Sequence, residues 1–142
     1  MTYKSNADKV LERLKSKLSP QAMESMNKEI AQSIFASNLV RIHSDGKAVN
    51  DSRIGDYAES TKKFRVRKHR EISFVDLEVS GRLRLSWKML KSGFGYVIGF
   101  GSKYGADISG YMEDHFSKTI WGVSDQDKEV ARNIVKRYFH AI

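Results

Sequence analysis

Apolar residues recur at helical spacing through the first third of the chain. In residues 8–18, "DKVLERLKSKL", they fall at three- and four-residue steps between lysines and an arginine, which predicts an amphipathic helix. A longer helix is predicted over residues 20–42, with Ser19 as its N-cap and Pro20 at its first position, where the missing N–H is not needed. A turn at Gly46 ends this helix. One stripe of it should lie on the core: Met23, Met26, Ile30 and Ile34.

The middle of the chain changes to strand-like patterns. Residues 72–79, "ISFVDLEV", alternate loosely between apolar and polar and predict a strand, whereas residues 82–87, "RLRLSW", predict a short helical turn. A β-hairpin is predicted about Ser92 and Gly93, and its return strand carries Tyr96, Val97, Ile98 and Phe100. These segments predict a small antiparallel sheet.

Two more helices are predicted toward the end of the chain. Residues 102–116 place apolar side chains at helical spacing, although Gly105 and Gly110 weaken the helix by about 1 kcal/mol each relative to alanine. Residues 118–123, "KTIWGV", favour a strand or an extended piece. Ser124 then precedes a closing helix with acids in its first turn and bases near its end, in accord with the helix dipole. The apolar face of this helix is broad: Val130, Ala131, Ile134, Val135, Tyr138 and Phe139.

The order of these elements predicts an α+β fold, in which helices pack on one face of a small antiparallel sheet. A chain of 142 residues supports one hydrophobic core, so residues 1–142 are expected to form a single domain. Its parts are a helical N-terminal part at 8–42, an extended basic arm at 47–71, and the sheet with the closing helices at 72–142.

Positive charge is concentrated in the stretch "TKKFRVRKHR" at residues 61–70. The formal net charge is +8, and six lysines and arginines in this stretch leave +8 − 6 = +2 for the rest of the chain. Because residues 47–71 have no regular period, a long loop is predicted, and such loops are usually functional or disordered. The candidate interface residues in it are Lys62, Lys63, Phe64, Arg65, Arg67, Lys68 and Arg70.

Three roles stay open for this arm. It could be a solvated loop, it could dock against an acidic protein surface, or it could hold nucleic acid, with Phe64 stacking on bases while the cations meet phosphates. One aromatic residue is weak support for the last of these.

Candidate catalytic groupings are few. The sequence has no cysteine, and its four histidines, at positions 43, 69, 115 and 140, are far apart, so no metal site is predicted. The glycines of "GFGYVIGFG" lack the spacing of a dinucleotide-binding loop. Asp76 and Glu78 would share one face of a strand and could hold Mg²⁺ in a nuclease, but ordinary surface charge is the better interpretation. We therefore expect no enzyme, no catalytic residue and no cofactor.

Membrane insertion is not expected either. No apolar run approaches the roughly 18 residues that cross a bilayer, and no hydrophobic segment follows the polar start of the sequence. Synthesis in the cytoplasm is the expectation.

Four segments follow one another across residues 46–124: "RIGDYAESTKK", "LEVSGRLRLSW", "YVIGFGSKYGAD" and "IWGVSDQD". This ordered pattern resembles the virion-morphogenesis, or tail-completion and neck, proteins of tailed bacteriophages, the Mu-like family. Gly105 departs from the family's habit of following the tyrosine directly with alanine. The positions that carry the resemblance are Ile54, Gly55, Tyr57, Ala58, Thr61, Leu77, Ser80, Gly81, Leu83, Ser86, Val97, Ile98, Gly99, Tyr104, Trp121, Gly122, Ser124 and Asp127.

The resemblance implies a non-enzymatic structural virion protein in a ring at the head-tail junction. The partners that the resemblance implies are further copies of itself in a closed ring, about six- or twelve-fold, the head-closure or connector proteins, and the tail terminator or tail tube protein. DNA could pass through the channel. Assembly would take place in the host cytoplasm, and the final location would be the neck or tail of the virion. The alternatives are a tail terminator ring and a basic nucleic-acid-binding module, with a nuclease a distant third.

Overall fold

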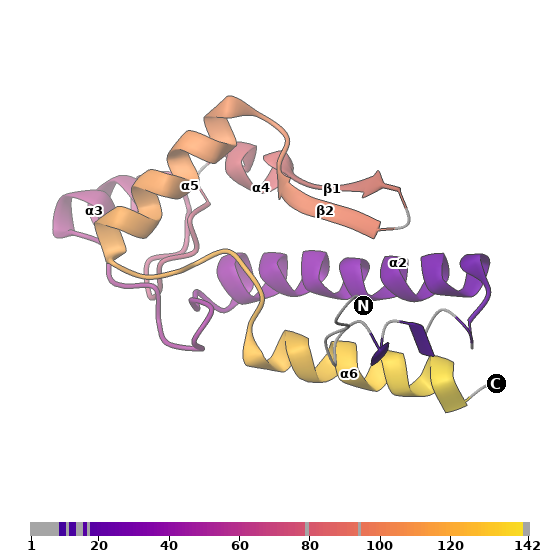
Figure 1. Cartoon of the computed structure of the whole chain (residues 1–142). Coiled ribbons are helices and arrows are strands. Elements are labelled where there is room, and N and C mark those ends of the chain that lie inside the picture. Colours follow the sequence, from indigo (N-terminus) through magenta and orange to yellow (C-terminus); the bar gives the residue numbers. More distant parts are fainter. Residues whose placement is uncertain are drawn as a thin grey trace.

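Helix α2 (Pro20–Leu39) is the central element of the fold, with a β-hairpin on one side and helix α6 (Asp125–His140) on the other (Figure 1). The computed structural model describes residues 9–10, 12–13, 16, 18–78, 80–93 and 95–140. The predicted α+β class is confirmed, because the described helices accompany one small antiparallel sheet.

Helix α2 begins as the sequence predicts. The Ser19 hydroxyl accepts a hydrogen bond from the backbone N–H of Ala22 at 3.1 Å, which caps the first turn. The helix continues into a π-helical turn, η1 (Val40–Ser44), and the chain then leaves through Gly46, whose φ of +65° favours glycine. Of the helix predicted over residues 8–18, residues 9, 10, 12, 13 and 16 are helical, and the others before Leu18 lie outside the described residues.

The hairpin is confirmed at the predicted place. Strands β1 (Trp87–Ser92) and β2 (Gly95–Phe100) pair antiparallel, and Gly93 turns between them with φ +61°. Trp87 lies on the helix side of the hairpin, where its indole N–H donates to the carbonyl of Phe35 in α2 at 3.3 Å. The sheet is therefore a two-stranded ribbon, and α2 supplies the packing that such a ribbon needs.

The strand predicted over residues 72–79 is wrong for residues 72–78, which form no strand in the structure. Val75 and Asp76 are adjacent and both buried, so burial does not alternate along this segment, and no strand among the described residues pairs with it. Residues 118–123 form no strand either; they run as irregular chain, and the side chain of Ile120 is fully buried.

Short and long helices follow the predictions in the second half. Helix α4 (Arg82–Ser86) is the predicted helical turn, and α5 (Lys103–Phe116) is the predicted helix, with the Ser102 hydroxyl accepting from the N–H of Gly105 at 3.1 Å. Helix α6 begins with a capping box, because Ser124 Oγ accepts from Asp127 N–H at 3.1 Å and Asp127 Oδ2 accepts from Ser124 N–H at 2.9 Å. No helix in the described part of the chain is long and apolar enough to cross a membrane.

The extended arm predicted at 47–71 is wrong. Residues Glu59–Arg67 form helix α3, and Lys47 and Arg53 form an isolated antiparallel bridge. The helix has no apolar stripe in its sequence, because the side chain that it buries is an arginine, Arg65.

Two clusters of buried apolar side chains hold these elements. The first lies where η1, the loops after it and the segment before α6 meet, and α5 packs on it: Ile42, Ala48, Ile54, Val75 and Ile120. The second joins the chain before α2 to α2 and α6: Leu18, Met26 and Ile134.

Candidate functional site

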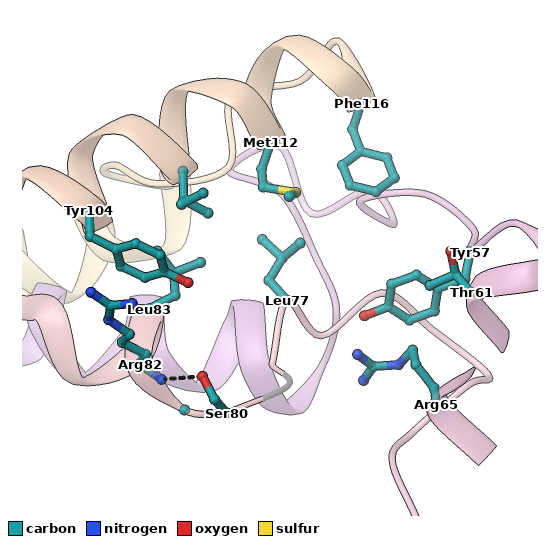
Figure 2. Close-up of a pocket in the computed structure, with 12 residues that line it drawn as sticks. Tyr57, Thr61, Arg65, Leu77, Ser80, Arg82, Leu83, Tyr104, Met112 and Phe116 are labelled. Atoms are coloured by element: carbon teal, nitrogen blue, oxygen red, sulfur yellow. Dashed lines mark hydrogen bonds between the residues drawn. The ribbon is translucent and has the colours of Figure 1, made fainter. Parts of the chain in front are cut away.

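Segments far apart in the sequence meet at one pocket between α3, α4 and α5, with a volume of about 310 Å³ (Figure 2). Seven positions of the phage-like pattern line it, and they come from three separate segments. These seven are Tyr57, Thr61, Leu77, Ser80, Gly81, Leu83 and Tyr104, and the other lining residues are Arg65, Arg82, Ile108, Met112 and Phe116. The sequence marked eight of these twelve residues, seven as pattern positions and Arg65 as a candidate interface residue, but it did not predict that they meet at one pocket.

The pocket has apolar side walls. Met112 and Phe116 reach in from α5, and Leu77 lies opposite them (Figure 2). Gly55 permits this packing, because a Cβ there would lie 2.5 Å from Cδ1 of Phe116. Gly81 adopts a φ of +79° immediately before α4, a conformation that favours glycine. These two glycines of the pattern therefore serve the backbone around the pocket.

Arg65 closes one end of the pocket and fastens α3 to the segment after it. Its side chain is 1% exposed, its Nε donates to the carbonyl of Glu71 at 2.7 Å, and its Nη1 donates to the carbonyl of Glu78 at 3.0 Å. Nη2 donates to Asp76 Oδ1 at 2.6 Å, and the guanidinium lies 4.3 Å from the ring centre of Tyr57. A buried arginine with this set of acceptors sets the position of the whole helix.

Asp76 is the acceptor around which this end of the pocket is built. Its Oδ1 accepts from Arg65, from the Tyr57 hydroxyl at 3.0 Å and from the N–H of Glu78 at 3.0 Å. The interpretation of Asp76 as surface charge is therefore wrong, because the residue is buried. Its bonds hold backbone and side chains in place, so we assign this carboxylate a structural role.

Burial shifts two titratable groups beside Asp76. The pKa of Tyr57 is raised to about 12, first by burial of the ring and then by the negative charge of Asp76. The pKa of His43 is lowered, chiefly because burial disfavours the imidazolium; its Nδ1–H donates to the carbonyl of Asp76 at 2.7 Å.

The other cations of residues 62–70 lie outside the pocket, three on α3 and two in the turn after it, and we call them the basic face: Lys62, Lys63, Arg67, Lys68 and Arg70. Lys62 is half-buried and pairs with Glu59 at 3.3 Å, whereas the other four are exposed and have no ion-pair partner among the described residues. Phe64 is 39% exposed, and Lys68 Nζ lies 6.0 Å from its ring centre. Val66, 55% exposed, and Ile72, 38% exposed, lie in a hollow beside the lysines.

Gly122, another position of the phage-like pattern, is held against the end of α2. The side-chain amide of Asn38 bonds both backbone groups of Gly122, accepting from its N–H at 3.0 Å and donating to its carbonyl at 2.9 Å. Arg41 donates to Asn38 Oδ1 at 2.9 Å and to the carbonyl of Ile120 at 2.8 Å. The burial of these two polar residues could not be predicted, because a single asparagine or arginine in a helix is usually exposed.

Other positions of the pattern belong to the hydrophobic interior. Ile54 is buried in the first cluster, and Trp121 packs on that cluster with its ring centre 5.3 Å from that of Phe100. Tyr57 and Trp121 are partly buried against the same cluster, whereas the candidate interface residue Phe64 is 39% exposed. Nothing near Gly99 explains a glycine there.

Comparison with known proteins finds no family model, no curated protein and no solved structure that matches this chain. Among the described residues, no group of three or more histidines, cysteines and carboxylates is placed to hold a metal ion. The resemblance to the phage family therefore stays a prediction that rests on the pattern residues themselves.

Proposed function

We propose that this protein is a structural virion subunit that forms a ring at the head-tail junction of a tailed bacteriophage and connects the portal-side connector to the tail. One observation carries the proposal. Seven pattern positions from segments 57–61, 77–83 and Tyr104 line a single pocket, so the pattern corresponds to one packed unit. Three of the segments that carry the resemblance therefore meet at one place in the fold.

The polar groups of the pocket support a structural role over a catalytic one. Asp76 accepts hydrogen bonds from both Arg65 and Tyr57, and Arg65 also donates to two backbone carbonyls. These polar groups therefore stabilise the fold. Their hydrogen bonds fix α3 against the segment that follows it. A subunit that must present the same surface to several neighbours benefits from such a fixed frame, because ordering on assembly then adds little entropic penalty.

The ring itself would arise from repeated head-to-tail contacts. A contact between two different surfaces of the same chain closes into a ring when its rotation closes, and charged surfaces can fix the register between stacked rings. The basic face carries four exposed cations that have no ion-pair partner among the described residues, and it lies on α3, which Arg65 holds in place, and on the turn after it. The expected neighbours are further copies, a connector protein and a tail terminator or tail tube protein.

The test is the copy number of the chain in purified virus particles, measured by quantitative mass spectrometry against the major capsid protein. We expect a fixed, low number of copies per particle. Absence from the particle would overturn the proposal. Electron microscopy of the protein mixed with its connector partner provides the second measurement, and a mixture that never yields closed rings would also count against it.

A further inference from the structure

The basic face groups four exposed cations on α3 and on the turn after it. Lys63 and Arg67 are four residues apart on α3, so they lie on one side of the helix with an axial separation of about 6 Å. Arg70 stays next to the helix end, because its N–H donates to the carbonyl of Arg65 at 2.8 Å. Lys68 extends the same positive surface toward Phe64.

Nearby carboxylates leave most of this charge uncompensated. Glu59 pairs with Lys62 at 3.3 Å. Glu71 is turned toward its own backbone, where Oε1 accepts from the N–H of Ile72 at 3.0 Å and from the N–H of Ser73 at 2.7 Å. Four cations of the basic face therefore remain available to an external anion.

Anchoring makes these cations a prepared surface. Arg65 is the inward-facing cation of the same helix and ties it to Glu71, Asp76 and Glu78. The backbone of the basic face is thereby fixed before any ligand arrives. Binding then has to order only the outer ends of the side chains, which lowers its entropic penalty.

We propose that the basic face binds the phosphate backbone of double-stranded DNA. Lysine and arginine contacts to phosphates supply affinity without reading bases, and they need no apolar anchor. An acidic protein surface would also attract the cations, but protein contacts are usually centred on residues packed in a pocket, whereas Arg67 and Arg70 are exposed and the basic face holds no tryptophan or tyrosine. Here the exposed apolar side chains are Phe64, Val66 and Ile72, and the cations dominate the surface.

This inference rests on the proposed function, because a ring at the head-tail junction surrounds the path of the genome. It adds a partner and assigns that partner to one helix. Copies arranged around a channel would each present one basic face, and weak contacts repeated around a ring would add up through multivalency. Contacts that do not read sequence suit DNA that has to move past them.

Counterion release gives the contact a quantitative signature. Each phosphate contact with duplex DNA contributes a slope of about −0.9 to the logarithm of the binding constant against the logarithm of salt concentration. Four contacts give a slope of about −3.6, so a fourfold rise in salt weakens binding roughly 150-fold. The double variant Lys63→Gln/Arg67→Gln should bring the slope to about −1.8, since two contacts are lost.

The experiment measures the binding of a fluorescently labelled random-sequence duplex to the full chain by anisotropy over a range of salt concentrations. The control is Lys28→Gln/Lys136→Gln, which removes the same charge from exposed positions on α2 and α6. We expect the control to keep the wild-type slope and the α3 variant to lose about half of it. Equal loss in both variants would overturn the inference, as would a wild-type protein that binds no duplex at low salt.

Poly-glutamate serves as the competing probe. A wild-type protein that binds poly-glutamate more tightly than the duplex would overturn the assignment to DNA in favour of an acidic protein surface. The outcomes stay separate from the ring proposal. Particles that contain the protein at fixed copy number, with no duplex binding, refute this inference alone, whereas duplex binding by a protein absent from the particle refutes the ring.

Discussion

Replacing Arg65 with leucine tests whether the basic segment is a fixed helix or a mobile arm. In the structure this side chain is 1% exposed and donates to Asp76 Oδ1 at 2.6 Å and to two backbone carbonyls. Leucine fills part of the space but leaves the buried carboxylate without its cation. Breaking a buried ion pair by removing one partner destabilises a protein by about 3 to 5 kcal/mol.

That loss is large against the total stability of a small domain, which is about 5 to 15 kcal/mol. We therefore expect Arg65→Leu to lower the midpoint of urea unfolding markedly, as followed by circular dichroism. Asp76→Leu should also destabilise, because it leaves the guanidinium buried without its counter-ion. The double variant Arg65→Leu/Asp76→Leu should lose less free energy of unfolding than the sum of the two single losses, because substitutions of residues that share one interaction are not additive.

The matched control is Arg67→Leu, two residues along the same helix and exposed. A substitution at such a surface position usually changes the free energy of unfolding by less than about 0.5 kcal/mol. If Arg65→Leu and Arg67→Leu were equally mild, the ion pair with Asp76 would not hold α3 in place, and the argument for a prepared basic face would fail.

Three further predictions follow from local geometry. In urea unfolding, Gly105→Ala should destabilise the protein by about 1 to 3 kcal/mol, because a Cβ there would lie 2.2 Å from a hydroxyl oxygen of α4. Gly110→Ala, where a Cβ would meet nothing within 4 Å, should stabilise α5 by about 0.5 to 1 kcal/mol. Equal effects of the two substitutions would contradict the packing of α5 on α4. The pKa of His43 is lowered in the folded state, so the contribution of this residue to folding stability is present above about pH 6.5 and is lost as the pH drops through the folded pKa. In acid unfolding, His43→Gln should therefore reduce the dependence of stability on pH. His140→Gln, at an exposed position, should leave that dependence unchanged. The pKa of Tyr57 is raised to about 12, so its contribution to folding stability is present below about pH 10 and is lost between pH 10 and 12. The loss should be less than about 2.7 kcal/mol, because the ring is only half-buried. If Tyr57→Phe loses stability with rising pH as steeply as the wild type, the coupling is refuted.

Caps and periodicity predicted the helices that make up most of the fold. Ser19 and Ser124 carry side chains that bond the first turns of α2 and α6, and such local chemistry is visible in the sequence without knowledge of the fold. The hairpin was predictable for the same reason, since Gly93 supplies the positive φ that its turn requires.

Helix α3 could not be predicted by the same rules. Its inward-facing residue is Arg65, which binary patterning counts as polar and exposed, and the partner that allows its burial, Asp76, comes 11 residues later in the chain. The pattern of residues 72–79 misled in the opposite direction. The sequence alternates there, but Val75 and Asp76 are both buried, and a strand needs a pairing partner, which sequence alternation alone does not supply.

The pattern residues and the exposed cations have different roles in this protein. Gly55, Gly81 and Gly122 stand where a side chain would collide or where φ is strongly positive, so these residues secure the fold. A fold can carry many functions, so residues that only secure the fold do not test the proposed ring. The basic face does not serve the frame, because four of its cations are exposed and unpaired among the described residues. If charge on α3 proves dispensable for both duplex binding and ring formation, the function must lie on another surface even though the fold assignment stands.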